Sequence, residues 1–248
     1  MTDISELKFY ATREHDCGYL PDQQAKTIFV DPNAPVDAEL YSELSEFGFR
    51  RSGPHIYRPH CGDCNACIPI RISAREFTPN KSQKRCLKRN SDLSKRIVDN
   101  INTDEHYALY ERYINERHSD GDMYPPTRAQ YADFLTKEWD ITQYIEYRFE
   151  ERLLAVSVVD RLENGLSAIY AYFDPQEQKR SLGVFNVLDQ LQRAKAKGLP
   201  YLYLGYWIKE CQKMRYKVDY RPFQVFVENQ WMMVRDYPSG HKSNENSN

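Results

Sequence analysis

The spacing of apolar residues after about residue 144 constrains the fold of this chain more than any other feature. Aromatic and β-branched residues there follow the two-residue period of strands, except over Leu182–Ala196, where the period is helical. The predicted strands are Tyr144–Phe149, Leu153–Val159, Leu166–Phe173, Tyr201–Gly205 and Phe223–Val227. Three strands, a helix and two strands predict an α+β fold. This order is compatible with an acetyltransferase-like (GNAT-type) mixed sheet with helices.

The residues before this sheet predict a smaller, loop-rich region. Asp37–Phe47 has helical spacing, with Asp37 as the cap and Gly48 as the stop. Gly53–Cys67 is rich in proline, glycine and cysteine, so we expect a loop there. Two further helices are predicted, one over Thr103–His118 and one that begins at Thr127.

These patterns divide the chain into three expected parts. Residues 1–100 are predicted to form an N-terminal cysteine-bearing domain with a basic helix. Residues 101–238 are predicted to form the acetyltransferase-like catalytic domain. Residues 239–248 are polar, and we expect a disordered tail because such a segment cannot bury apolar surface.

Charge and composition restrict the class of protein. The 248 residues carry a formal net charge of −2, so a nucleic-acid-binding surface has to be a local patch. No apolar stretch approaches the roughly 20 residues of a membrane span. The first residues also lack the basic and apolar segments of a secretory signal. We therefore expect a cytoplasmic protein whose six cysteines are reduced thiols or metal ligands.

A cysteine run is the most conspicuous local pattern. It reads Cys61-Gly-Asp-Cys64-Asn-Ala-Cys67, and Cys17 lies upstream of it. Thiolates two residues apart can bind one ion together, and a structural zinc site takes four ligands. The fourth ligand would come from Cys17, Cys86, His55 or His60. The alternative is a set of reduced thiols, some of them buried as small apolar side chains.

A second pattern is basic. Residues 81–96 carry seven cations against one anion, and in a helix most of the cations fall on one side. Such a stripe suits a phosphate backbone, to which lysine and arginine give affinity without reading the sequence. A solvated helix surface is the alternative. The candidate nucleic-acid-binding residues are Lys81, Lys84, Arg85, Lys88 and Arg89.

Cations and aromatic residues alternate in a third segment, Tyr206–Pro222, directly after a predicted strand. Aromatic and cationic groups together can hold a base, a ribose or a small anion. Residues in the loop beyond a strand are well placed for function. A structural role alone would not need so many cations in so short a span. Of the five cations in this segment, the candidate binding residues are Lys213, Arg215, Lys217 and Arg221.

Several enzyme motifs are missing from the sequence. It has no Walker loop, no G-x-S-x-G elbow and no H-E-x-x-H motif. Gly183 is followed by Val184, Phe185 and Asn186, where a loop for the pyrophosphate of acyl-CoA would have a second small residue. A CoA-dependent acetyltransferase is therefore disfavoured. A non-catalytic, zinc-stabilised RNA-binding module is another alternative.

Five segments together resemble the arginyl-tRNA–protein transferases. Gly205–Ile208 and Lys213–Lys217 resemble the C-terminal signature of that family, and Tyr172–Pro175 its segment ahead of the central helix. Cys17–Tyr19 resembles its N-terminal start. The cysteine pattern within Tyr57–Arg71 looks like the compact bacterial branch, the aspartate/glutamate leucyltransferases. The resemblance runs in order from about residue 15 to residue 230.

The resemblance implies an acetyltransferase-like catalytic fold, a leucyl-tRNA donor and an acceptor protein that begins with Asp or Glu. The product would be marked for degradation by the N-end rule. Arginyl-tRNA as the donor stays open, although the compact length and the bacterial-type cysteine loop favour leucine. Neither DNA nor a membrane is an expected partner. Leu20 stands where eukaryotic members have a second cysteine, which weakens a zinc ion or an iron–sulfur cluster at Cys17, Cys61, Cys64 and Cys67.

Ester aminolysis runs downhill without ATP, so no cofactor is required. At pH 7 roughly a tenth of an α-amino group with a pKa near 7.7–8.0 is already neutral, so no strong base is compulsory either. We expect Lys213, Arg215, Lys217 or Arg221 to bind the acidic side chain of the acceptor. Tyr206 and Tyr216 are expected to orient the reacting carbonyl or the terminal adenosine. Asp174 would help to remove the amine proton, and the stripe from Lys81 to Arg96 would bind the tRNA acceptor stem.

Overall fold

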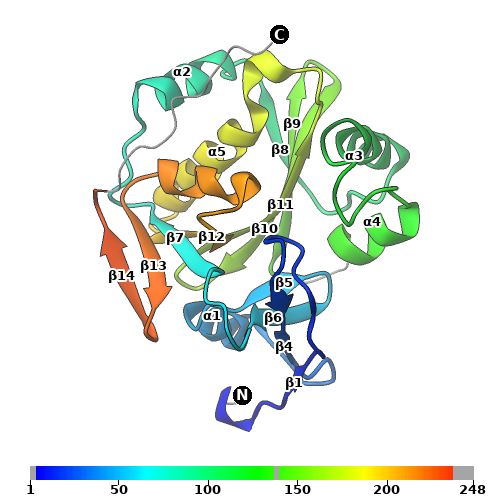
Figure 1. Cartoon of the computed structure of the whole chain (residues 1–248). Helices are drawn as coiled ribbons and strands as arrows, with labels where there is room; N and C mark the ends of the chain where they lie inside the picture. The colour runs from blue at the N-terminus through cyan, green and yellow to red at the C-terminus, as the bar shows by residue number, and fades with distance from the viewer. Residues whose placement is uncertain (1–3, 137–139, 237–248) are drawn as a thin grey trace.

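One large sheet forms the centre of the molecule (Figure 1). The computed structural model describes residues 4–136 and 140–236. The strand order is β14-β13-β7-β12-β11-β10-β9-β8, and of these neighbours only β11 and β12 run parallel. The strands are β7 (Ile68–Ser73), β8 (Ser94–Val98), β9 (Thr142–Phe149), β10 (Arg152–Leu162), β11 (Gly165–Phe173), β12 (Tyr201–Trp207), β13 (Phe223–Val227) and β14 (Gln230–Val234).

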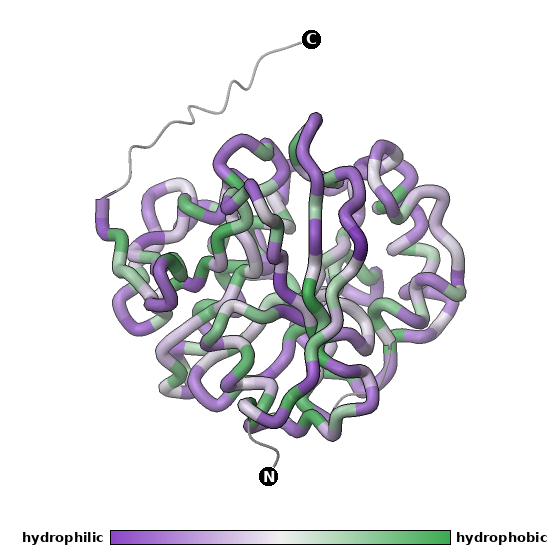
Figure 2. Tube along the Cα trace, turned by 60° about the horizontal axis from the view of Figure 1, so that its bottom comes forward, coloured by the Kyte–Doolittle hydropathy of each residue, from purple (hydrophilic) through white to green (hydrophobic). Residues whose placement is uncertain are grey.

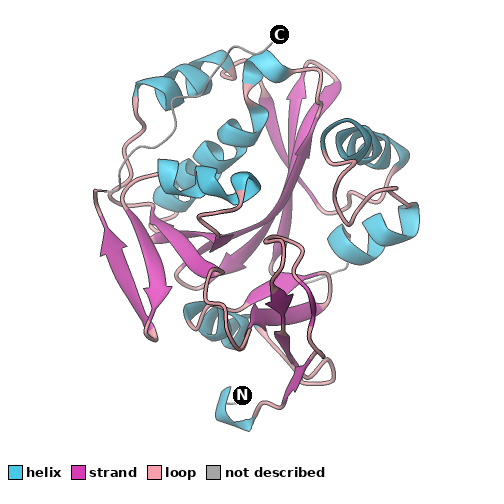
Figure 3. Ribbon diagram, viewed as in Figure 1, coloured by secondary structure: helices cyan, strands magenta, loops and turns pink. Residues whose placement is uncertain are grey.

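Helices cover both faces of this sheet (Figure 3). One face carries α2 (Lys81–Arg89) and α5 (Leu182–Ala196), and the other carries α3 (Asp104–Arg117) and α4 (Arg128–Leu135). Side chains alternate along β10 to serve both cores: Ala155 packs on the α5 side, whereas Val156 and Val158 pack on the α3 side. The inner parts of the trace are mostly apolar, and the peripheral loops are mostly hydrophilic (Figure 2).

A smaller sheet lies against one end of the large one. Its order is β1-β4-β6-β5, and α1 packs beside it in a third core with Leu162 and Tyr203 of the large sheet. Arg51 of β5 donates to both oxygens of the buried Asp160 of β10 at 2.7 and 2.8 Å, and so joins the two sheets. The remaining elements are β1 (Phe9–Ala11), β2 (His15–Asp16), β3 (Gln24–Ala25), β4 (Thr27–Val30), α1 (Ala38–Glu46), β5 (Arg50–Ser52), β6 (His55–Pro59), η1 (Ile4–Glu6), η2 (Gln178–Arg180) and η3 (Gln212–Asp219).

Most of the predicted elements are confirmed. Asp37 caps α1 by accepting the Leu40 N–H at 2.9 Å, and Thr103 and Thr127 are the caps of α3 and α4. The bounds predicted for α5 and β13 are the observed ones. No helix within the described residues is both long enough and apolar enough to cross a membrane.

Two local predictions are wrong. The expected loop Gly53–Cys67 contains β6, because residues 55–59 pair with β4 on one side and β5 on the other. The basic segment is helical only as far as Arg89: Asn90 ends α2, and Lys95 and Arg96 belong to β8, which pairs with β9. Strands from both sides of residue 100 share the large sheet. The predicted tail lies outside the described residues.

Candidate active site

The candidate site begins where the parallel strands β11 and β12 separate. Their pairing ends at Ser167 and Tyr203, although both strands continue beyond these residues. The guanidinium group of Arg50, from β5 of the small sheet, occupies this opening. It donates from Nη1 to Ser167 Oγ at 2.7 Å and from Nη2 to the Ala168 carbonyl at 2.5 Å. Arg50 thus satisfies a backbone carbonyl at the point where the strands part.

Gly205 of β12 leaves room for this guanidinium. A Cβ atom at residue 205 would lie 3.2 Å from Arg50 Nε and 3.4 Å from Nη2. The backbone φ angle of Gly205 is +76°, which side chains rarely tolerate. A larger residue here would therefore strain the strand and displace Arg50.

Lys217 of η3 brings a second buried cation to the same place. Its Nζ donates to the Tyr206 carbonyl at 2.6 Å and lies 3.1 Å from Met214 Sδ. Burial lowers the pKa of Lys217 to about 7, and the nearby Arg50 charge acts in the same direction. Near neutral pH this amine is therefore divided between its charged and neutral forms.

Arg50 and Lys217 differ from the other buried cations of the described residues. Neither forms an ion pair with a carboxylate within that part of the chain. The other buried arginines each have one: Arg51–Asp160 at 2.7 Å, Arg71–Glu46 at 2.6 Å and Arg148–Glu146 at 2.7 Å. Burying a cation without an anion is costly, so the two cations mark a place where an anionic ligand is favoured.

Tyrosines surround the two cations. The rings of Tyr57 and Tyr206 lie 6.1 Å apart. Tyr206 is buried, and its hydroxyl donates to the Gly48 carbonyl at 2.9 Å. Tyr216 is 45% exposed, and the centre of its ring lies 6.0 Å from Lys217 Nζ. Of the two tyrosines predicted to be catalytic, Tyr216 is therefore the accessible one, while Tyr206 is bonded to the backbone.

The other three predicted acceptor-binding cations have partners of their own. Lys213 forms an exposed ion pair with Asp120 at 2.8 Å. Arg215 donates to the Lys209 carbonyl at 3.0 Å, and Arg221 donates to the Val218 carbonyl at 3.2 Å. The structure thus separates the four cations into one buried lysine and three groups with other contacts.

Asp174 follows directly after β11. Its carboxylate is nearly buried, accepts the Gln176 N–H at 3.0 Å and lies 3.8 Å from Arg112 Nη2. A polar pocket of about 310 Å³ adjoins it, lined by Glu116, Arg117, Pro175 and Gln178. Asp174 therefore shapes the Asp-Pro turn and faces a cationic side chain at once.

A larger cavity of about 470 Å³ lies between the small sheet and the α3–α4 region. Its apolar wall includes Tyr110, Met123 and Phe134, and Asp122 and Asp133 contribute carboxylates. Such a volume is ordinary for a small-molecule site, for which about 300–1,000 Å³ is typical. The remaining lining residues are Ser52, Gly53, Pro54, His55 and Gln130.

The predicted start segment Cys17–Tyr19 adjoins this cavity. A Cβ atom at Gly18 would lie 3.6 Å from Oδ2 of Asp122, which lines the cavity. Burial raises the pKa of Tyr19 to about 12, and the neighbouring Tyr57, Cys67 and Asp122 act in the same direction.

The structure gathers the predicted cysteines. Burial raises the pKa of Cys67 to about 12, and the neighbouring thiols Cys17, Cys61, Cys64 and Cys211 act in the same direction. Cys61 Sγ accepts the Lys26 N–H at 3.5 Å. Within residues 4–136 and 140–236, no group of three or more His, Cys, Asp or Glu side chains is arranged to hold a metal ion.

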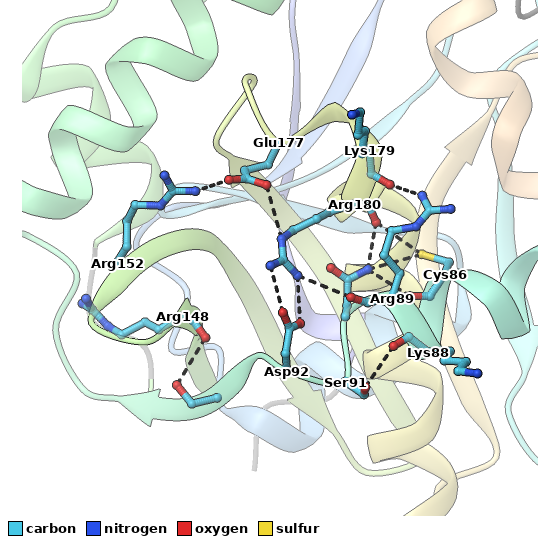
Figure 4. Close-up of polar contacts among 12 residues, drawn as sticks. Cys86, Lys88, Arg89, Ser91, Asp92, Arg148, Arg152, Glu177, Lys179 and Arg180 are labelled. Carbon is cyan, nitrogen blue, oxygen red and sulfur yellow. Dashed lines mark hydrogen bonds and ion pairs between the residues drawn. The ribbon is translucent and has the colours of Figure 1, made fainter.

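The basic stripe is exposed on α2. Figure 4 shows its C-terminal end, where Arg89 donates to the Lys179 carbonyl and Arg180 binds Asp92 at 2.8 and 2.9 Å. These bonds join α2 to η2 and so to the start of α5. Four further cations are exposed and form no ion pair within the described residues: Lys81, Lys84, Arg85 and Lys88.

Sequence reasoning missed Arg50 and the cavity residues. The sequence shows two successive arginines, Arg50-Arg51, in a short segment after a helix, and gives no sign that their partners lie more than a hundred residues away. The one available signal was a pair of charged residues beside apolar Phe49, an unusual start for a buried strand.

Curated relatives align with nearly the whole chain. An aspartate/glutamate leucyltransferase from Teredinibacter turnerae is 61% identical over 235 residues, which cover 94% of this chain and 97% of the relative. Proteins of the same name from Saccharophagus degradans and Pseudomonas fluorescens are 57% and 51% identical, again over 94% of this chain and over 99% and 100% of theirs.

Among solved structures, the similarity is distant. The C-terminal domain of a putative lysylphosphatidylglycerol synthetase from Agrobacterium fabrum has a TM-score of 0.41 at 13% identity, over 68% of this chain and 52% of that one. Two family models match this chain: the N-terminal part of the arginine-tRNA-protein transferases over residues 15–85, and their C-terminal part over residues 105–227. Both halves are present in order, and the chain belongs to the arginine-tRNA–protein transferase family.

Proposed function

We propose that this protein transfers leucine from leucyl-tRNA to the N-terminal α-amine of proteins that begin with Asp or Glu. The 61% identity to an aspartate/glutamate leucyltransferase over 97% of that relative carries this proposal. The product would be marked for degradation by the N-end rule, and the reaction would take place in the cytoplasm.

An acetyltransferase-like (GNAT-type) fold is part of the proposal. The support is a mixed sheet in which one parallel pair, β11 and β12, is connected through the crossover helix α5. The two strands separate after three residue pairs, and Arg50 lies in the opening between them. In this arrangement the donor and the acceptor would meet beside Arg50 and Tyr216.

The cavity beside Tyr19 is our proposed site for the leucyl end of the donor. Met123 and Phe134 offer an apolar wall to the isobutyl group, and the Tyr170 hydroxyl contacts Met123 Sδ at 3.4 Å. Asp122 offers a carboxylate to the α-ammonium group of the leucyl ester. A carboxylate also suits the guanidinium of arginine, so the choice of leucine rests on the names of the relatives.

The exposed cations of α2 are our proposed contact with the tRNA acceptor stem: Lys81, Lys84, Arg85, Lys88 and Arg89. Lysine and arginine contacts to phosphates give affinity that does not depend on sequence. Arg89 donates to the Lys179 carbonyl and Asn90 to the Arg180 carbonyl, and these bonds support this role because they attach the basic helix to η2 at the start of α5 (Figure 4).

In the proposed reaction the neutral α-amine of the acceptor attacks the ester carbonyl of leucyl-tRNA. A C–N bond forms, the C–O bond to the terminal ribose breaks, and the amine proton ends on the departing ribose oxygen. Positioning alone can lower such a barrier by about 7–11 kcal/mol. Tyr206 and Tyr216 would position the carbonyl or the terminal adenosine, and Asp174 would help to move the proton. Lys213, Arg215, Lys217 or Arg221 would bind the acidic side chain.

This chemistry needs neither an oxidant nor ATP, so we propose that no cofactor takes part. No step of the reaction is assigned to a zinc ion or an iron–sulfur cluster.

Mass spectrometry of an Asp-initiated peptide, incubated with the protein and a mixture of charged tRNAs, tests the proposal. We expect a mass gain of one leucine and no gain with an otherwise identical Ala-initiated peptide. A gain of arginine would overturn the donor. Retention of tRNA binding without any product would instead favour a non-catalytic RNA-binding module.

A further inference from the structure

We propose that Arg50 and Lys217 together form the pocket that binds the side-chain carboxylate of the acceptor's first residue. This inference rests on the proposed function, because it names the groups that would select Asp or Glu. Arg50 was not among the binding residues predicted from the sequence. Lys217 was one of four candidate cations, and the sequence alone did not favour any of them.

The first argument is electrostatic. Arg50 and Lys217 are 9% and 6% exposed, and neither has an acidic partner within the described residues. A buried charge without a counter-ion costs several kcal/mol, whereas the fold supplies a carboxylate to every other buried arginine. A site that holds two cations unpaired in the free protein is suited to an anion that arrives with a substrate.

The second argument is geometric. A guanidinium has five N–H groups, and the bonds to Ser167 and Ala168 use two of them. These bonds fix the plane of Arg50 and leave N–H groups for a carboxylate, to which arginine binds with two parallel hydrogen bonds. Gly205 presents no side chain to the Nε edge of the group. Three of the five N–H groups of Arg50 thus remain for a ligand.

The third argument concerns the surroundings of Lys217. The charged or titratable groups near it are Arg50 from β5, Cys67 from the loop before β7, Cys211 from the loop after β12, and Tyr216 from η3 itself. None of these is a carboxylate, and the Lys217 Nζ bonds are to a carbonyl and a thioether. An entering carboxylate would be its first anionic partner.

The other three predicted acceptor-binding cations do not offer this combination. Lys213 already has Asp120 as a partner, and both side chains are largely exposed, so its charge is screened by solvent. Arg215 and Arg221 are half-buried, and each donates to a backbone carbonyl of its own segment. Discrimination between Asp and Asn at a chain end needs a desolvated site, because a solvated ion pair contributes little.

The test compares two peptides that differ only in the first residue, Asp or Asn. Their affinities for the wild-type protein and for the Lys217→Met, Arg50→Lys and Lys209→Met variants are measured by fluorescence anisotropy, without tRNA. We expect the wild type to bind the Asp peptide at least tenfold more tightly than the Asn peptide. Lys217→Met and Arg50→Lys should remove that preference. Lys209→Met removes an exposed cation of the same loop and should keep it.

Steady-state transfer from leucyl-tRNA to the two peptides then gives a second, independent readout. If Lys217 holds the carboxylate, Lys217→Met raises the KM for the Asp peptide at least tenfold and leaves the KM for the Asn peptide nearly unchanged. Equal losses with both peptides, or weaker tRNA binding instead, would overturn the pocket. Preferential binding of the Asp peptide by a protein that transfers no leucine would refute the proposed function and leave the pocket standing.

Discussion

Lys217 is a residue that the fold keeps at a cost in stability. Its pKa is about 7 in the folded protein, against an ordinary value of 10.5. Between these two pH values the unfolded chain binds a proton that the folded protein does not, so stability rises with pH over this window. Below pH 7 the Lys217 amine is protonated in both the folded and the unfolded state. The free energy of unfolding is then reduced by the full cost of burying this charge. Such a cost is typical of functional residues.

Replacement of Lys217 by Met should therefore stabilise the protein. We expect the free energy of unfolding at pH 7 to rise by about 1–4 kcal/mol, the range found when buried charges give way to apolar side chains. The advantage should shrink as the pH approaches 10, where Lys217 is neutral in the folded protein. Denaturant titrations at pH 7 and pH 10 measure both effects. A variant that is less stable than the wild type at pH 7 would contradict the unpaired, buried state of Lys217.

Two glycines with similar backbones allow the role of Arg50 to be tested separately. Gly205 and Gly198 have φ angles of +76° and +72°, but only Gly205 has atoms of Arg50 where a Cβ would lie. Gly205→Ala and Gly198→Ala should each lose about 1–2 kcal/mol of stability from backbone strain. Only Gly205→Ala should also weaken binding of an Asp-initiated peptide, because it displaces the guanidinium. Equal peptide affinities in the two variants would argue against Arg50 as a ligand.

At the scale of elements, hydrophobic periodicity predicted the helices and strands that have a clear local pattern. It missed strands whose formation depends on pairing with other strands. Leu182–Ala196 and Phe223–Val227 were predicted with their observed bounds. Strand β7 alternates Ile68, Ile70 and Ile72 with polar residues or proline, yet the cysteines and prolines before it suggested a loop. Its place between β12 and β13 depends on partners more than a hundred residues away. Strand β6 was missed for a different reason: its partners β4 and β5 lie nearby in the sequence, but its prolines and the cysteines after it are typical of a loop.

The basic face of α2 leads to a prediction about the helix as a unit. Reversal of Lys84, Arg85 and Lys88 to Glu should weaken tRNA binding at least tenfold. The dependence of log affinity on log salt should become shallower by about 2, since each lost phosphate contact removes about 0.7–0.9. Filter binding at several salt concentrations measures both quantities. Reversal of Lys195 and Lys197, exposed at the far end of α5, is the control and should change neither.

At the scale of the whole molecule, the site exists because two sheets meet. Arg50 comes from the small sheet, Ala168 and Gly205 from the separating strands, and Lys217 from η3. Lys217 could be predicted from the sequence, because it lies in a conspicuous segment. Arg50 could not be predicted, because its partners Ser167 and Ala168 lie 117 and 118 residues away along the chain. The side chain that carries our inference is thus placed by tertiary structure alone.

Docking of the small sheet should therefore control acceptor recognition from a distance. Arg51 holds β5 to β10 through Asp160, whose side chain is fully buried, and Arg50 is the adjacent residue. Asp160→Asn leaves the Arg51 charge without its anion, and we expect a loss of about 3–5 kcal/mol of stability. Because β5 carries Arg50, we also expect the preference for Asp-initiated over Asn-initiated peptides to fall at least fivefold.

Glu146→Gln is the matched control for this variant. Glu146 is also nearly buried and accepts from Arg148 at 2.7 Å. Both residues of this pair belong to β9, so the pair does not join the large sheet to the small one. Arg148 keeps Glu105 as a second anion at 2.6 Å, so the loss of Glu146 should destabilise the protein by less than Asp160→Asn does. It should leave the peptide preference unchanged, as measured by anisotropy below the unfolding transition. If both variants lowered the preference equally, general loosening of the fold would explain the effect. If only Asp160→Asn lowered it, the interface between the sheets would be the element that positions Arg50.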